Sequence, residues 1–174
     1  MGLNGMLKQG KEVILAESRV LKSLAENLDH SFERAIHLMQ DCKSNIVITG
    51  VGKPYIIGQK IAASMSSIGS RAFPLHSVDA LHGDLGRICT GDVVFFMSNS
   101  GESNEIVELI RATKHLKIMR IAITSNPESR LGEEANLTLD LGAIAEADPF
   151  GIVHWLGFEG VTALGKVISP ENGS

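Results

Sequence analysis

Apolar residues recur along this chain in two alternating patterns, short continuous runs and positions at helical spacing. The runs predict strands, because a buried parallel strand is apolar on both faces. Helical spacing separates each run from the next, and strands that alternate with helices are typical of an α/β fold. We therefore expect a three-layer α/β sandwich with a five-stranded, mainly parallel sheet flanked by helices. The expected strands span residues 45–50, 71–75, 92–97, 119–124 and 137–141.

The chain begins with helical periodicity before any expected strand. Apolar positions recur at helical spacing between residues 7 and 28, and a second helix is expected from Ser31, a candidate N-cap, to about Cys42. These two extra N-terminal helices are available to pack on the sheet or on another subunit. At the other end, a loop is expected at 143–151, followed by a helix at 155–168 that its glycines weaken.

No linker, repeat or low-complexity segment divides the chain, so we expect a single domain over residues 1–174. Within it, N-terminal helices occupy 1–43, the α/β core occupies 44–168 and a short tail follows at 169–174. A hydrophobic content of 44% and a charged content of 21% are typical of a globular protein.

Composition also narrows the class of partner. The net charge is -4 and basic residues form no cluster, which argues against nucleic acid. No apolar run approaches the length of a membrane span, and the N-terminus lacks a hydrophobic signal core, so a cytoplasmic protein is expected. Cys42 and Cys89 stand in no metal-ligand spacing, and no metal site is expected.

The most informative stretch is Ser-Asn-Ser-Gly-Glu-Ser at residues 98–103, between an expected strand and a helix. The first N–H groups of a helix lack internal partners and carry the positive end of its dipole, so such a turn favours an anion. The hydroxyls of Ser98, Ser100 and Ser103 add donors suited to a phosphate ester. The alternative is an ordinary polar turn in which Ser103, followed by Glu105, caps the helix.

A second turn follows the first expected strand as Gly50-Val51-Gly52-Lys53. It has neither the spacing of a Walker A loop nor the further glycines of a dinucleotide fingerprint. It predicts a tight turn that brings backbone close to a ligand and places the Lys53 ammonium beside it. The alternative is that Lys53 is a solvated residue at the start of a helix.

The segment Ala80-Leu81-His82-Gly83-Asp84-Leu85-Gly86 places an imidazole and a carboxylate between glycines. His82 is a candidate acid/base group near neutral pH. The alternative is a loop in which Asp84 caps a turn. The spacing of the two residues is not a metal signature.

Taken in order, these three motifs and Ile-Thr-Ser-Asn-Pro-Glu-Ser at 123–129 resemble the sugar isomerase (SIS) domain family. The resemblance covers about residues 21 to 151, and within the family the chain most resembles arabinose 5-phosphate isomerase, on the His-Gly-Asp-Leu-Gly segment paired with Gly-Lys. It implies a flavodoxin-like sheet, a homotetramer, a sugar phosphate as ligand and no cofactor. The implied reaction interconverts D-ribulose 5-phosphate and D-arabinose 5-phosphate through a cis-enediol, for synthesis of the eight-carbon sugar Kdo.

The resemblance also implies which residues form the site. Lys53, His82 and Glu105 match catalytic positions, with Glu105 as base, His82 as proton shuttle or ring-opening acid and Lys53 as partner of the enediolate. The implied substrate and phosphate contacts come from Gly52, Ser98, Asn99, Ser100, Gly101, Glu102 and Ser103.

The chain departs from the family pattern in its last part. Residues 153–159 replace a Thr/Ser-rich segment that closes over the phosphate, and neither the family's downstream Ser-His-Pro-Gly-Gly segment nor a tandem CBS pair is present. Slow turnover is expected for this reason. Two alternatives stay open: a phosphosugar-binding or regulatory module without turnover, and a 6-phospho-3-hexuloisomerase suggested by the Ile-Thr-Ser-Asn-Pro stretch at 123–127.

Overall fold

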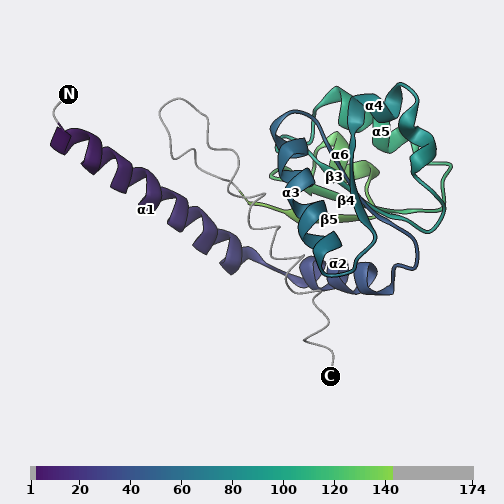
Figure 1. Cartoon of the computed structure of the whole chain (residues 1–174), viewed down its shortest axis with the longest axis horizontal. Helices are drawn as coiled ribbons and strands as arrows, with labels where there is room; N and C mark the ends of the chain where they lie inside the picture. The colour runs from purple at the N-terminus through teal and green to yellow at the C-terminus, as the bar shows by residue number, and fades with distance from the viewer. Residues whose placement is uncertain (1–2, 143–174) are drawn as a thin grey trace.

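The computed structural model describes residues 3–142, which form an α/β body and one helix that extends from it (Figure 1). The described helices are α1 (Leu3–Asn27), α2 (His30–Asp41), α3 (Lys53–Ser67), α4 (Ser77–Leu81), α5 (Asn104–Ala112) and α6 (Arg130–Glu134), with a 3-10 helix η1 at Asp84–Arg87. The described strands are β1 (Ile46–Gly50), β2 (Ala72–His76), β3 (Val93–Met97), β4 (Met119–Thr124) and β5 (Leu137–Asp140).

The sheet confirms the expected architecture. Its order is β2-β1-β3-β4-β5, and every pair of neighbouring strands is parallel. The chain runs from β1 to β2 on one side of β1 and then crosses to β3 on its other side, so the direction of strand addition reverses at β1. In open parallel sheets a ligand binds beyond the carboxyl ends of the strands at this reversal.

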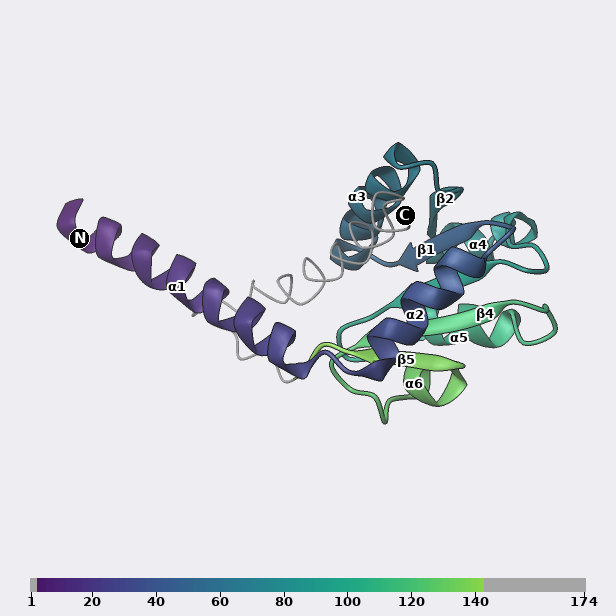
Figure 2. The same cartoon turned by 90° about the horizontal axis from the view of Figure 1, so that it is seen from below.

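Helices cover both faces of the sheet. On one face α2 and α3 pack on β1, β3 and β4 through residues such as Met39, Met65 and Phe95. On the other face α4, α5 and α6 contribute Ala80, Ile110 and Leu131 (Figures 1 and 2). Strand β3 is buried along its whole length, as its continuous apolar run predicted, because both of its faces are covered by helices.

Helix α1 projects away from the α/β body in both views (Figures 1 and 2). It joins the core through Leu24, whose exposed fraction is 8%. Five other large apolar side chains of this helix lie on the surface, with exposed fractions from 42% to 66%. They are Met6, Leu7, Ile14, Leu15 and Leu21.

The helix caps correct one detail of the sequence interpretation. The N-cap of α2 is Asp29, whose carboxylate accepts a hydrogen bond from the Ser31 amide at 2.8 Å, so Ser31 lies inside the helix. Both residue types cap helices well, and they stand two positions apart. The expected loop at 143–151, the helix at 155–168 and the altered segment at 153–159 lie outside the described residues. Within residues 3–142 no helix combines the length and the apolar character needed to cross a bilayer.

Candidate phosphate site at the carboxyl edge of the sheet

Two turns meet at the carboxyl edge of the sheet, where the strand order reverses. The turn after β1 leads into α3, and the turn after β3 leads into α5. Because β1 and β3 are neighbours in register, with Gly50 opposite Met97, both turns start at the same level. The sequence motifs at 50–53 and 98–103 are therefore placed side by side.

The turn after β3 gathers hydroxyl groups around buried Ser98. The Oγ atoms of Ser98 and Ser103 lie 3.0 Å apart, and the Gly101 N–H donates to Ser98 Oγ at 3.2 Å. Ser98 has an exposed fraction of 3%, whereas Ser100 is exposed and its Oγ accepts the Glu102 N–H at 3.2 Å. The turn is thus a shallow hydroxyl-lined cradle, and we use "cradle" for residues 98–103 below.

The start of α5 lies directly beside this cradle. Ser103 occupies the N-cap position, but its hydroxyl caps no backbone amide of the helix and pairs with Ser98 instead. The Val107 N–H donates to the Ser103 carbonyl at 3.0 Å, so the amides of residues 104–106 precede the first helical hydrogen bond. The capping interpretation therefore holds for the position of Ser103 and not for its side chain.

The loop between β4 and α6 supports the cradle from one side. The Asn99 carbonyl accepts the Ser125 N–H at 2.9 Å and the Thr124 hydroxyl at 3.0 Å, and Asn99 Oδ1 accepts the Ser125 hydroxyl at 2.6 Å. The sequence interpretation used Ser125 only as part of the motif at 123–129 and gave it no contact with the cradle. The signal available was topological, since neighbouring parallel strands deliver their following loops to the same edge.

Gly101 is required where the cradle touches this loop. Its φ is +68°, and a Cβ atom added to it lies 1.9 Å from Ser129 Oγ and 2.4 Å from Ser129 Cβ. The Gly101 carbonyl also accepts the Leu131 N–H at 3.1 Å. Only glycine combines this backbone conformation with such a close approach.

Glu102 lies on α6. Its carboxylate accepts the Arg130 N–H at 3.0 Å and forms an ion pair with the Arg130 guanidinium, at an exposed fraction of 44%. The backbone and side-chain hydrogen bonds from Arg130 lower the pKa of Glu102 below its ordinary value. The Glu102 carboxylate is therefore paired with Arg130, a residue that the sequence interpretation did not name.

The three candidate catalytic residues follow three different strands at this same edge. Lys53 is the exposed first residue of α3, preceded by Gly52 at the N-cap with a φ of +61°. His82 is exposed and directly follows α4, which itself follows β2. Glu105 is partly exposed in the first turn of α5. Helices α4 and α5 pack against each other, which brings the segments carrying His82 and Glu105 onto one side of the edge.

Sequence reasoning also missed a contact at the ends of β1 and β2. His76 is the register partner of Gly50, and its ring meets the Tyr55 ring edge-on with centroids 4.8 Å apart. Beneath it, the buried hydroxyls of Thr49 and Ser77 lie 2.8 Å apart. These contacts fix the start of α3, and therefore Lys53, against the end of β2.

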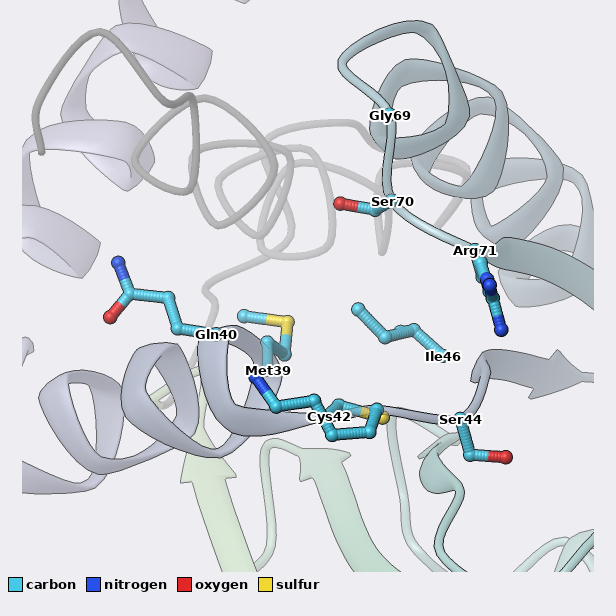
Figure 3. Close-up of a pocket in the computed structure, with 9 residues that line it drawn as sticks. Met39, Gln40, Cys42, Ser44, Ile46, Gly69, Ser70 and Arg71 are labelled. Atoms are coloured by element: carbon cyan, nitrogen blue, oxygen red, sulfur yellow. The ribbon is translucent and has the colours of Figure 1, made fainter.

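A pocket of about 390 Å³ lies at the opposite, amino edge of the sheet (Figure 3). Met39 and Ile46 form apolar parts of its lining, and Ser70 directs its hydroxyl toward the gap (Figure 3). Its remaining lining residues precede β1 or β2, or end α2. None of the candidate catalytic or phosphate-binding residues lines it.

The chain is similar in sequence and in fold to known proteins. Arabinose 5-phosphate isomerase KdsD of Yersinia pestis is 39% identical over 160 residues, and that of Escherichia coli K12 is 41% identical over 160 residues. Each alignment covers 92% of this chain and 49% of the relative, so the chain spans about half the length of these curated relatives.

A solved structure of a protein from E. coli CFT073, in complex with arabinose 5-phosphate, superimposes with a TM-score of 0.90 and 29% sequence identity. That superposition covers 98% of this chain and 91% of the solved one. The family model described as SIS domain matches residues 38–154, about two thirds of the sequence. The chain therefore belongs to the SIS domain family.

Proposed function

We propose that this chain is an aldose–ketose isomerase that interconverts D-ribulose 5-phosphate and D-arabinose 5-phosphate through a cis-enediol. The observation that carries the proposal is the Ser98–Ser103 hydroxyl pair, 3.0 Å apart at the start of α5. Ser103 stands at the N-cap but does not cap the helix with its side chain, so its hydroxyl and that of Ser98 lie together beside the first amides of α5. The relatives' names support the choice of sugar.

Phosphate binding is the first half of the proposal. The amides of residues 104–106 and the hydroxyls of Ser98, Ser100 and Ser103 supply neutral donors, and the positive end of the α5 dipole favours the dianion. Phosphorylated pentoses are expected to bind and their unphosphorylated forms are not. Isothermal calorimetry with arabinose 5-phosphate and arabinose tests this, and equal affinities would remove the basis for the site.

Proton transfer is the second half. Glu105 stands in the first turn of α5, next to the cradle, and takes the proton at C1 or C2 as general base. His82 moves protons between the sugar oxygens, and the Lys53 ammonium stabilises the enediolate. The isomerisation is an internal redox reaction, because one carbon is oxidised as its neighbour is reduced, so no redox cofactor is needed.

Exchange of the C2 proton with deuterated water tests the chemistry. Glu105→Gln is expected to reduce exchange by about 100- to 10,000-fold, the usual loss for one general base, and to keep phosphate binding. Glu108→Gln is the matched control, because Glu108 is an exposed carboxylate on the same helix. No exchange in the unaltered protein, with phosphate binding retained, would favour the binding-module alternative.

We further propose that the chain assembles as a homotetramer through α1. A helix on which five large apolar side chains are 42% to 66% exposed presents a stripe that another copy can cover. Ile14→Lys is expected to lower the mass measured by light scattering. Ser18→Lys places the same charge at an exposed polar position of α1 and is expected to leave the mass unchanged. A monomeric unaltered protein at micromolar concentration would contradict the assembly.

A further inference from the structure

Arg130 forms hydrogen bonds at the start of α5 in addition to its ion pair with Glu102. Its Nε pairs with Glu102 Oε2, and its backbone N–H donates to Glu102 Oε1 at 3.0 Å. Its second guanidinium nitrogen donates to the Glu102 carbonyl at 2.7 Å and to Asn104 Oδ1 at 3.2 Å. One side chain of α6 thus engages backbone and side-chain atoms at the start of α5.

These contacts bracket Ser103. Glu102 precedes Ser103 and Asn104 follows it, and Arg130 donates to both. Ser103 in turn supplies the hydroxyl that lies 3.0 Å from Ser98 Oγ. The guanidinium therefore holds the Glu102–Ser103 peptide unit through its carbonyl and the Asn104 side chain through its oxygen, one on each side of the Ser103 hydroxyl.

A second ion cluster on the same two helices provides a comparison. Glu134, in α6, pairs with Arg111 at 2.9 Å and with Lys114, both at the far end of α5 from the cradle. The side chains of Arg130 and Glu102 are 42% and 44% exposed, and ion pairs this exposed contribute little to stability. If the Arg130 contacts served only to dock α6 on α5, the Glu134 cluster would serve the same purpose equally well.

We propose that Arg130 is a positioning residue for phosphate binding, acting through Glu102 and Asn104 on the hydroxyl and amides of the cradle. This inference rests on the proposed function, because the cradle must bind a phosphate for its positioning to matter. Arg130 itself need not touch the ligand. Its planar fork supplies the fixed geometry that a flexible ammonium lacks.

Three variants test the proposal: Arg130→Gln, Arg130→Lys and, as control, Glu134→Gln. Arg130→Gln is expected to raise the Kd for arabinose 5-phosphate and for inorganic phosphate about tenfold, with a rise in KM and a smaller change in kcat. Arg130→Lys keeps the charge without the fork and is expected to recover less than half of this loss. Glu134→Gln is expected to leave Kd and KM unchanged.

Amide hydrogen exchange gives a readout that does not depend on turnover. Arg130→Gln is expected to increase exchange at the Val107 amide, which closes the first turn of α5, and Glu134→Gln is not. Glu102→Gln is also expected to raise the Kd. The double variant Glu102→Gln with Arg130→Gln is expected to lose less binding free energy than the sum of the two single losses, because the two side chains interact directly.

Several results would overturn the proposal. An unchanged Kd for Arg130→Gln would do so, as would an equal loss with Glu134→Gln, which would mean general docking of α6. Full recovery with Arg130→Lys would mean that only the charge acts. If the unaltered protein binds no sugar phosphate, the proposed function fails. Amide hydrogen exchange then decides alone. Faster exchange at the Val107 amide in Arg130→Gln, and not in Glu134→Gln, would support the role of Arg130 in holding the start of α5. Unchanged exchange in Arg130→Gln would refute it.

Discussion

Gly101→Ala is the change that the structure predicts to be most damaging to the cradle. The added methyl group would lie 1.9 Å from Ser129 Oγ and 2.4 Å from Ser129 Cβ. Rotation of the Ser129 side chain moves its Oγ but leaves its Cβ in place, and Ser129 has an exposed fraction of 2%. The methyl group can therefore be accommodated only if the backbone of the cradle or of the β4–α6 loop moves.

Two costs add at this position. A non-glycine residue at positive φ costs about 1–2 kcal/mol, and forcing a methyl group into packed surroundings costs about 1–3 kcal/mol. We therefore expect Gly101→Ala to lower the free energy of unfolding by about 2–5 kcal/mol. Gly69→Ala isolates the first cost, because Gly69 has a φ of +89° and no atom within 4 Å of an added Cβ.

Urea unfolding of both variants at one protein concentration measures the difference, and calorimetry with inorganic phosphate measures the site. Gly101→Ala is expected to lose phosphate binding, whereas Gly69→Ala, which stands at the opposite edge of the sheet, is expected to bind as the unaltered protein does. Equal losses of stability in the two variants, or unchanged phosphate affinity in Gly101→Ala, would refute the reasoning.

Three further predictions concern single side chains. Ser100→Ala is expected to weaken phosphate binding by about 1.5–3 kcal/mol, measured by calorimetry, because it removes one donor to a charged group. Asp92→Asn is expected to lower the free energy of unfolding in urea by about 1–3 kcal/mol, because the 1% exposed carboxylate accepts hydrogen bonds only and an amide would set donor against donor. Hydrogen bonds from Lys114 and Arg111 lower the pKa of Glu134 below its ordinary value of 4.5. The stability that this cluster gives is therefore complete above about pH 5 and lost as the pH falls through the folded pKa, so urea midpoints of Glu134→Gln and the unaltered protein should converge on acidification.

The fold was predictable because its information is local. Each strand is a short apolar run, and the bounds agree within about a residue, as at 119–124, where the expected strand and β4 coincide. Periodicity could not give the strand order, which depends on contacts between distant segments; only the family resemblance implied it. Ser31 was taken for a cap because serine and aspartate cap helices for the same reason, and only the geometry of α2 distinguishes them.

The sequence could group the residues of the candidate site that lie in one turn, but it could not predict contacts between two different turns. Ser98, Ser100 and Ser103 lie in one stretch, so their hydroxyls could be grouped from the sequence. Arg130 stands 28 residues from Glu102, on a helix of five residues, and in the sequence it is indistinguishable from a solvated arginine. Its contact follows from the pairing of β3 with β4, which the sequence does not state.

The position of the two cysteines in the fold has a practical consequence for handling this protein. The two cysteines of the sequence, Cys42 and Cys89, both precede strands at the amino edge, and Cys89 is the more exposed. A strand of five residues separates that edge from the cradle by about 16 Å. A maleimide dye on Cys89 would thus report from the side remote from the ligand. Protein tethered to a surface through the same thiol would present the candidate phosphate site to the solution.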